Sequence, residues 1–211
     1  MSFFERVSPP DQLFVQQKFA PIANRYYIST LGPDGKSPGQ LLAFVKQKRM
    51  KIREDIRFFD GEEQTTEVLR IKAKTRFEFR GRYDIELPNR QAIGQLKKDF
   101  WNSLTRSRWL LFDGAGNQVA WCQEKSLAIA LLRRFVDFVP IVGGLLSFAF
   151  KFVPFHFDLY AGPGHQDVGD YVRLPALRDR YRLDLTKDTN HYIDRRLALA
   201  WVVALDCLTD R

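Results

Sequence analysis

The C-terminal segment constrains the fold most strongly. After Asp194, Arg195 and Arg196, residues 197–205 contain no charged side chain and are apolar on nearly every side of a helix. A helix of this kind has no face suited to water, so the rest of the protein must surround it. We therefore predict a buried helix over residues 193–208 and a fold that encloses it.

The remainder of the chain is dominated by β patterns. In residues 70–80, the side chains of Ile71, Ala73, Thr75, Phe77 and Phe79 alternate with charged residues, which places them on one face of a strand. Shorter runs of the same type occupy residues 13–15, 25–28, 41–45, 83–87, 92–96, 109–112, 118–122, 155–160, 171–174 and 181–185. Turn residues separate these runs, as in sandwiches and barrels.

These patterns predict a mainly β protein: an antiparallel β-barrel of about twelve strands enclosing the apolar C-terminal helix. Residues 1–10 are expected to be a flexible lead-in, and residues 11–211 a single barrel domain. Two further helices are predicted, a short one over residues 50–56 and an amphipathic one over residues 126–138. The uncharged runs at 138–150 and 197–205 are too short to span a membrane.

Charge and cysteine content bound the function class. The chain has 33 basic and 25 acidic residues, a net charge of +8, which favours anionic partners but is equally compatible with simple solubility. Cys122 and Cys207 are far apart and match no metal or disulfide spacing, which indicates a reducing compartment. Residues 1–10 lack an apolar signal-peptide core, so we expect a cytoplasmic protein.

No motif indicates catalysis. His156, His165 and His191 lack the i, i+4 spacing of a helical zinc site, and no nucleophile is placed beside them. Gly114 and Gly116 fit a hairpin turn better than a dinucleotide-binding loop. We predict a protein that is not an enzyme and that has no cofactor, no metal and no nucleic-acid partner.

A basic strand is the leading functional candidate. Its cations share one face of residues 70–76 and follow a second basic stretch at 46–51. The candidate residues for anionic lipid are Lys46, Lys48, Arg49, Lys51, Arg70, Lys72, Lys74 and Arg76. The alternative is a solvated strand face, partly neutralised by the four glutamates at 54, 62, 63 and 67.

A second candidate is the apolar segment 138–155 beside the basic end of the predicted helix. It is suited to dip into one leaflet of a membrane. The membrane-contact candidates are Arg133, Arg134, Val142, Leu145, Leu146 and Phe148. The alternative is a segment packed over one opening of the barrel.

Short stretches spread along the chain resemble one known superfamily. They are FVKQK at 44–48, RIKAK at 70–74, RYD at 82–84, IGQL at 93–96, WLLFD at 109–113, EKS at 124–126, LRR at 132–134, PFHFD at 154–158 and DRRLALA at 194–200. Together with the final helix they resemble the tubby C-terminal-like superfamily, in particular its LURP-one-related and phospholipid scramblase-like branch. The resemblance runs from about residue 13 to residue 208.

The resemblance implies a barrel threaded by its C-terminal helix, and a link to phospholipids. Tubby-like domains bind phosphoinositides, and scramblases move lipids with calcium. Scramblases place an acidic calcium-binding segment before the last helix; here residues 184–190 supply some oxygen ligands, but Arg195 falls where an acid is needed. We therefore expect no calcium site.

Taken together, these features predict a non-enzymatic, peripheral membrane or phospholipid-binding protein of the scramblase and LURP-one-like type. It would lie in the cytoplasm or at the inner face of the membrane. The alternative is a protein-interaction or structural module without lipid affinity, whose partner would dock on residues 138–150.

Overall fold

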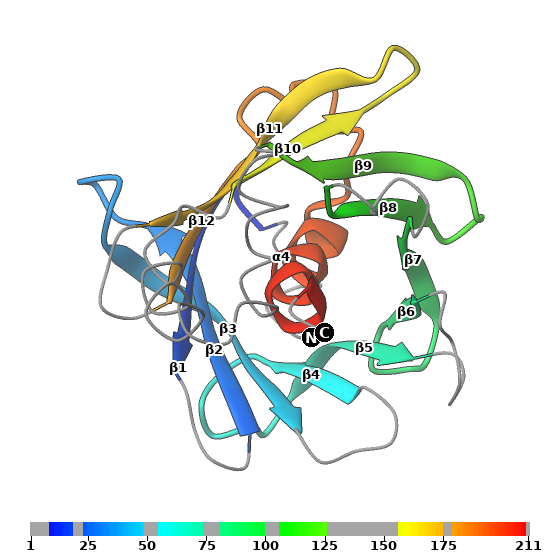
Figure 1. The fold of residues 1–211 in the computed structure, drawn as a ribbon. Helices are drawn as coiled ribbons and strands as arrows, with labels where there is room; N and C mark the ends of the chain where they lie inside the picture. The colour runs from blue at the N-terminus through cyan, green and yellow to red at the C-terminus, as the bar shows by residue number, and fades with distance from the viewer. Residues whose placement is uncertain are drawn as a thin grey trace, which may run out of the picture.

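Twelve antiparallel strands close into a barrel around the C-terminal helix in a computed structural model of the protein (Figure 1). The structure describes residues 9–18, 23–48, 55–73, 81–99, 106–125, 156–174 and 179–209. The strands are β1 (Gln12–Lys18), β2 (Ala23–Leu31), β3 (Pro38–Lys48), β4 (Asp55–Phe59), β5 (Glu67–Ala73), β6 (Arg82–Glu86), β7 (Ala92–Lys98), β8 (Arg108–Asp113), β9 (Gln118–Glu124), β10 (His156–Ala161), β11 (Gln166–Leu174) and β12 (Arg180–Asp184). The C-terminal helix is α4 (Arg195–Thr209).

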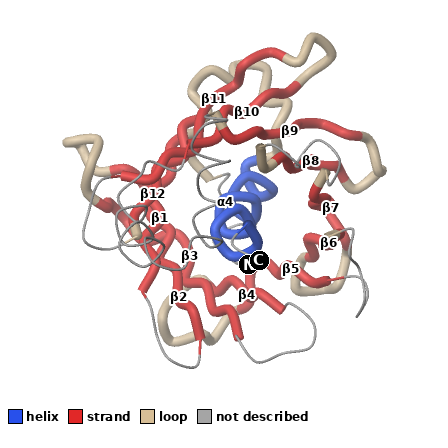
Figure 2. Tube along the Cα trace, in the orientation of Figure 1, coloured by secondary structure: helices blue, strands red, loops and turns tan. Residues whose placement is uncertain are grey.

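The barrel has a simple topology. Every strand pairs with its neighbours in sequence, and β12 returns to β1, with Leu13 opposite Leu183. Figure 2 shows the strands as a ring around the helix. Because the twelve described strands close on themselves, none of them is an edge strand, which removes the usual site of edge-to-edge aggregation.

Alternation along each strand sorts the side chains between the two faces. Val45, Phe58, Ile71, Ile85 and Leu96 point inward and are at most 2% exposed. Because period two sends each neighbouring residue to the opposite face, the outer surface carries the charged positions of the same strands. The alternation therefore shows, for each candidate site residue on these strands, whether its side chain lies on the inner or the outer face of the barrel.

Helix α4 occupies the interior of the barrel. Its side chains from Leu197 to Leu205 are all at most 2% exposed, and Trp201 is among the largest buried residues. The backbone N–H of Arg196 donates to the Asp194 carboxylate at 2.8 Å, which caps the helix at its start. Gly94 on β7 gives the helix room, because a Cβ there would lie 2.7 Å from Leu197 Cδ2.

A buried polar cluster closes the other end of α4. Tyr26 and Tyr181 both donate their phenol O–H to the Asp206 carboxylate, at 2.8 Å in the case of Tyr26. The Cys207 thiol donates to the Tyr26 oxygen at 3.1 Å. Burial is the main cause that raises the pKa of Tyr26, Tyr181 and the neighbouring Tyr171 well above the usual value of a phenol.

The predicted fold is confirmed: the protein is mainly β, with a closed twelve-strand barrel and a central C-terminal helix. The short helix predicted over residues 50–56 is wrong at its end, because Asp55 and Ile56 begin strand β4. Residues 126–138 and 74–80 lie outside the described residues. Within the part of the chain that is described, no helix is long and apolar enough to cross a membrane.

Candidate functional site

The outer surface of strands β3 to β7 carries the basic residues that the sequence singles out. We call this surface the basic face. Its described cations are Lys46 on β3, Arg57 on β4, Arg70 and Lys72 on β5, Arg82 on β6 and Lys97 on β7. The register brings them into rows, with Lys46 opposite Arg57, Arg57 opposite Arg70, and Arg82 opposite Lys97.

Two of these cations are bound to carboxylates. The Nε of Arg70 donates to Asp55 at 2.7 Å, and both side chains are almost fully buried. Arg57 binds the same carboxylate at 3.2 Å and lies 3.7 Å from Glu67. The hydrogen bond to Asp55 is the main cause that raises the pKa of Arg57. Arg57 and Arg70 therefore act mainly in joining β4 to β5.

The other four cations of the basic face form no ion pair with a described residue. Lys46 donates to the Gln64 amide oxygen at 3.1 Å. Lys72 lies on β5 between the positions of Asp55 and Asp84, while Arg82 and Lys97 face each other across β6 and β7. All four side chains are partly exposed. These positive charges are available to an external anion.

The two predicted basic stretches are not direct neighbours. Strand β4 lies between β3 and β5, and its Asp55 neutralises Arg70. Of the predicted lipid-binding residues, the structure brings Lys46, Arg70 and Lys72 to one face, and Lys48 belongs to the end of β3. The remaining candidates lie outside the described residues: Arg49, Lys51, Lys74, Arg76, Arg133, Arg134, Val142, Leu145, Leu146 and Phe148.

Arg82 and Lys97 were missed at the level of sequence. A hollow of about 400 Å³ opens beside them on the outer side of β6, β7 and β8. The rest of its lining consists of Asp84, Ala92, Gln95, Phe112 and Asp113 together with glycines of β7 and the β8–β9 turn. The sequence does place a basic residue at each end of the predicted hairpin, which could have indicated this site. Whether Arg82 and Lys97 face each other depends, however, on a β-bulge between Ile85 and Glu86.

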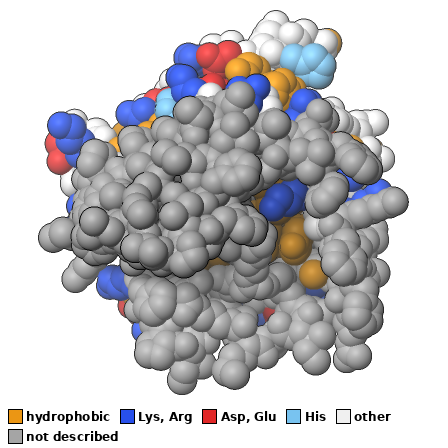
Figure 3. Space-filling model, in the orientation of Figure 1, with side chains coloured by type: hydrophobic (Ala, Val, Ile, Leu, Met, Phe, Trp, Pro, Cys, Tyr) orange, Lys and Arg blue, Asp and Glu red, His pale blue; other side chains and the backbone are white. Residues whose placement is uncertain are grey.

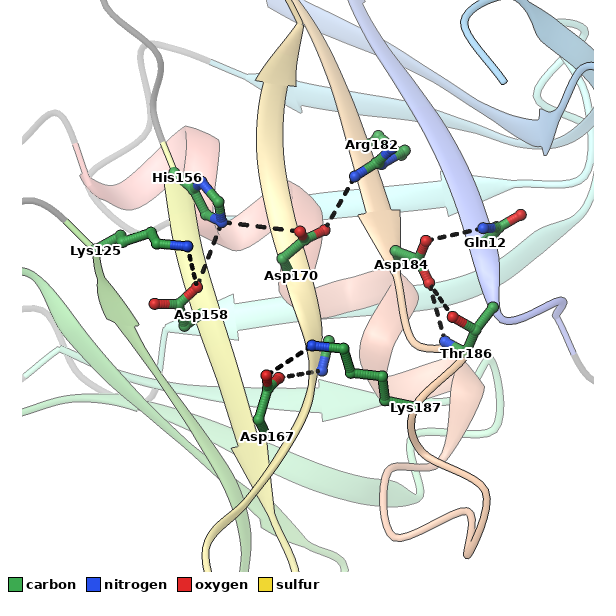
Figure 4. Close-up of polar contacts among 11 residues, drawn as sticks. Gln12, Lys125, His156, Asp158, Asp167, Asp170, Arg182, Asp184, Thr186 and Lys187 are labelled. Atoms are coloured by element: carbon green, nitrogen blue, oxygen red, sulfur yellow. Dashed lines mark hydrogen bonds and ion pairs between the residues drawn. The ribbon is translucent and has the colours of Figure 1, made fainter. Parts of the chain in front are cut away.

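The surface of β10 to β12 has a different electrostatic character. Figure 4 shows its acidic and basic side chains paired with one another. Lys125 lies 3.6 Å from Asp158, Arg182 lies 3.4 Å from Asp170, and Lys187 lies 2.7 Å from Asp167. In Figure 3, positive and negative side chains are intermixed on this side of the barrel. The positive charge is largely matched here, in contrast to the basic face.

The histidines and cysteines do not assemble a reaction centre among the described residues. His156 lies on the outer face, with Nε2 3.4 Å from Asp158 and 3.8 Å from Asp170, so it is not the core residue that the sequence favoured. The Trp121 indole N–H donates to His165 at 3.2 Å. Burial raises the pKa of the Cys122 and Cys207 thiols. No group of three His, Cys, Asp or Glu side chains within the described ranges is placed to hold a metal ion.

The segment that resembles a calcium loop is held by an arginine. The Arg195 Nη1 donates to Asp188 at 2.6 Å, and its Nε donates to Asp11 at 2.8 Å. The Asp188 carboxylate is fully buried and also accepts the backbone N–H groups of Tyr192 and Ile193. In a calcium-binding loop the metal ion would supply the positive charge beside a carboxylate such as Asp188. Here the Arg195 guanidinium supplies that charge instead.

A closed antiparallel barrel threaded by its C-terminal helix defines the chain as a protein of the tubby-like class. The model of the LURP-one-related family matches residues 42–206, from β3 to the last turns of α4. The chain therefore belongs to the LURP-one-related family. Comparison with the curated proteins and with the solved structures found no match.

Proposed function

We propose that this protein is a non-enzymatic, peripheral binding protein for anionic phospholipid surfaces, and that the basic face makes the contact. One observation carries the proposal. Lys46 on β3, Lys72 on β5, Arg82 on β6 and Lys97 on β7 project from one side of the barrel without an ion pair to any described carboxylate. Membership of the LURP-one-related family supports a lipid-related role of this kind.

The energetics favour a surface-bound protein with salt-sensitive affinity. A basic residue near an anionic membrane contributes about 1 kcal/mol, and this attraction decays within a Debye length. Four such residues contribute on the order of 4 kcal/mol, which gives reversible binding and not permanent insertion. The protein would then move between the cytoplasm and the inner face of the membrane.

The barrel shape suits a docking role better than lipid transport. The interior is filled by α4, whose side chains from residue 197 to residue 205 are buried against the strands. Among the described residues, the filled interior leaves no path for a lipid chain, so the membrane contact that we propose uses the outer surface of the barrel. We therefore prefer lipid recognition to scrambling as the activity of this chain.

Co-sedimentation with vesicles tests the proposal. The full chain is mixed with phosphatidylcholine vesicles, or with vesicles that also contain phosphatidylserine, at low and at physiological salt, with calcium or with a chelator. We expect binding to the anionic vesicles alone, weakened by salt and insensitive to calcium. Absence of binding in every condition would contradict the proposal and favour a protein-interaction module.

A further inference from the structure

The strongest unassigned feature is the hollow beside Arg82 and Lys97. It measures about 400 Å³ and opens on the outer side of β6, β7 and β8. This volume lies within the range of small-molecule sites, which is about 300–1,000 Å³. Gly94, Gly114 and Gly116 line part of it, so peptide groups and not side chains form that wall.

The positions of the two cations in the hollow lower the stability of the fold. Arg82 and Lys97 occupy directly opposite positions of β6 and β7. Like charges in such positions destabilise a sheet. On β4 and β5, Arg57 and Arg70 are also directly opposite each other, but ion pairs with Asp55 and Glu67 relieve their repulsion. Arg82 and Lys97 form no ion pair with any described side chain. An anion bound between them would remove the repulsion.

The two acids of the hollow are already engaged. Asp84 accepts a hydrogen bond from the Gln95 amide at 2.8 Å. Asp113 accepts the backbone N–H groups of Ala115 and Asn117, at 2.9 and 2.8 Å, and so belongs to the β8–β9 turn. Hydrogen bonds, first of all from the Asn117 side chain, lower the pKa of Asp113. Asp113 therefore keeps its negative charge, and the two carboxylates disfavour a ligand whose negative charge spreads across the whole hollow.

This lining selects among anions. A phosphate monoester carries a charge of about −1.5 to −2 at neutral pH, which matches two cations, and its three terminal oxygens suit a planar guanidinium. Asp84 disfavours a second phosphate but accepts hydrogen bonds from hydroxyl groups. Phe112 offers an apolar wall to a carbon frame. The best match is one phosphate monoester on a small hydroxylated frame.

We infer that the hollow formed by Arg82, Lys97, Asp84, Gln95 and Phe112 is a binding site for a single phosphate monoester carried on a small hydroxylated carbon frame. The group can come from a lipid headgroup that ends in a monoester or from a soluble phosphorylated polyol. The inference rests on the proposed function, because it names the chemical group that the basic face recognises specifically.

Calorimetric titration of the full chain with glycerol 3-phosphate, and with glycerol as the unphosphorylated reference, tests the site. We expect saturable binding of glycerol 3-phosphate alone. The variant Arg82→Gln/Lys97→Gln should weaken it at least about tenfold, because each change removes a charged hydrogen-bond partner of the phosphate. Lys46→Gln, which removes a cation of the same face outside the hollow, should leave the affinity within about twofold. Equal losses in both variants would overturn the inference.

Vesicles separate the two sources of the group. Phosphatidic acid presents a monoester and phosphatidylglycerol a diester, so vesicles of each are matched in surface potential and mixed with the chain. Tighter binding to phosphatidic acid, reversed by glycerol 3-phosphate, assigns the site to a lipid headgroup. Equal binding to both vesicles together with glycerol 3-phosphate binding assigns it to a soluble ester.

The same experiment distinguishes the two possible failures. Equal binding to both vesicles without any binding of glycerol 3-phosphate overturns the monoester site and leaves the proposed function standing. Glycerol 3-phosphate binding without binding to either vesicle overturns the proposed function and leaves the site. Absence of all three interactions overturns both.

Discussion

The guanidinium of Arg195 lies 2.6 Å from the buried carboxylate of Asp188 and ties the loop after β12 to the first turn of α4. Arg195 also donates to the backbone carbonyls of Ile193 and Asp188, so nearly all of its donors are used inside the protein. The central helix is thereby fixed to the barrel at its N-terminal end by one side chain.

Arg195→Ala should destabilise the protein by about 3–5 kcal/mol, because removing one partner leaves the other charge buried and unpaired. Urea unfolding monitored by tryptophan fluorescence measures the loss. Arg196→Ala is the matched control, since the Arg196–Asp194 pair is about one-third exposed on both sides, and it should cost no more than about 1 kcal/mol. Similar losses in the two variants would show that Asp188 is not held by Arg195.

Calcium should not change the unfolding midpoint of the wild-type protein. The positive charge beside Asp188 is already supplied by Arg195, and the carboxylate also accepts two backbone N–H groups. Thermal unfolding with 1 to 10 equivalents of calcium and with a chelator provides the comparison. A concentration-dependent rise in Tm with calcium would contradict this reading of the loop.

Gly169 on β11 is required by a close approach of the backbone. A Cβ at this position would lie 1.9 Å from the carbonyl oxygen of Asp184, which belongs to β12. Gly169→Ala should therefore open the contact between β11 and β12 and cost several kcal/mol, as severe backbone conflicts do. Gly164→Ala is the control, because a Cβ there meets nothing closer than 3.8 Å. Denaturant unfolding measures the loss of stability in both variants. A loss at Gly169 as small as that at Gly164 would contradict the register of β11.

Alkaline pH should destabilise the fold through the buried tyrosines. Burial is the first cause that raises the pKa of Tyr26 and Tyr181 in the folded state. Cys207 and then Asp206 add to it at Tyr26, and Asp206 adds to it at Tyr181. Below a pH of about 10 both states hold these protons, so stability does not depend on these groups. Above it the unfolded chain loses them and the folded chain retains them, so stability falls as pH rises.

Each such tyrosine should contribute a slope of roughly 1.4 kcal/mol per pH unit above pH 10. Urea unfolding between pH 8 and pH 11.5 measures this slope, and tyrosinate absorbance reports the ionisation. Tyr181→Phe should reduce the slope by the contribution of one tyrosine, roughly 1.4 kcal/mol per pH unit. A folded protein that gains tyrosinate absorbance near pH 10 at these positions would contradict the prediction.

Removing either charge of the opposed cation pair should stabilise the free protein. Arg82 and Lys97 face each other without a described counter-ion, and relief of such a pair is worth about 0.2–1 kcal/mol. Lys97→Gln should raise the midpoint of urea unfolding while it weakens anion binding. Lys187→Gln, which breaks a pair with Asp167 at 2.7 Å, should lower the midpoint slightly or leave it unchanged. A destabilising Lys97→Gln would show that the pair is already neutralised within the protein.

The central architecture follows from two sequence patterns. A helix that is apolar on all sides demands an enclosure, and repeated period-two runs supply one, so the barrel and its central helix are predictable. Strand β4 is not predictable from these patterns, because residues 55–59 lie directly after a run with helix-like spacing. Phe59 falls on the outer face opposite Phe44, which breaks the expected polar pattern of an exposed surface.

The candidate site is harder to predict because it depends on register. Counting back from a turn at 88–90 without interruption would place Arg82 opposite Leu96. The bulge between Ile85 and Glu86 shifts the pairing by one residue, so that Arg82 faces Lys97 and Leu96 points into the core. A one-residue shift of this kind exchanges the two faces of a strand, and residue patterns alone do not reveal it. The pairing of Arg70 with Asp55 was hidden for a related reason, since β4 was not recognised.

The central claim is that the unpaired cations of the basic face bind anionic membranes, and matched charge variants test it most directly. Lys72→Gln/Arg82→Gln/Lys97→Gln and Lys125→Gln/Arg182→Gln/Lys187→Gln each remove three positive charges, from the basic face and from the β9–β12 side respectively. We would measure their binding to phosphatidylserine-containing vesicles at physiological salt. The first variant should lose on the order of 100-fold in affinity, at about 1 kcal/mol per residue, and the second should lose much less. Equal losses would show that binding follows net charge alone and would contradict the account.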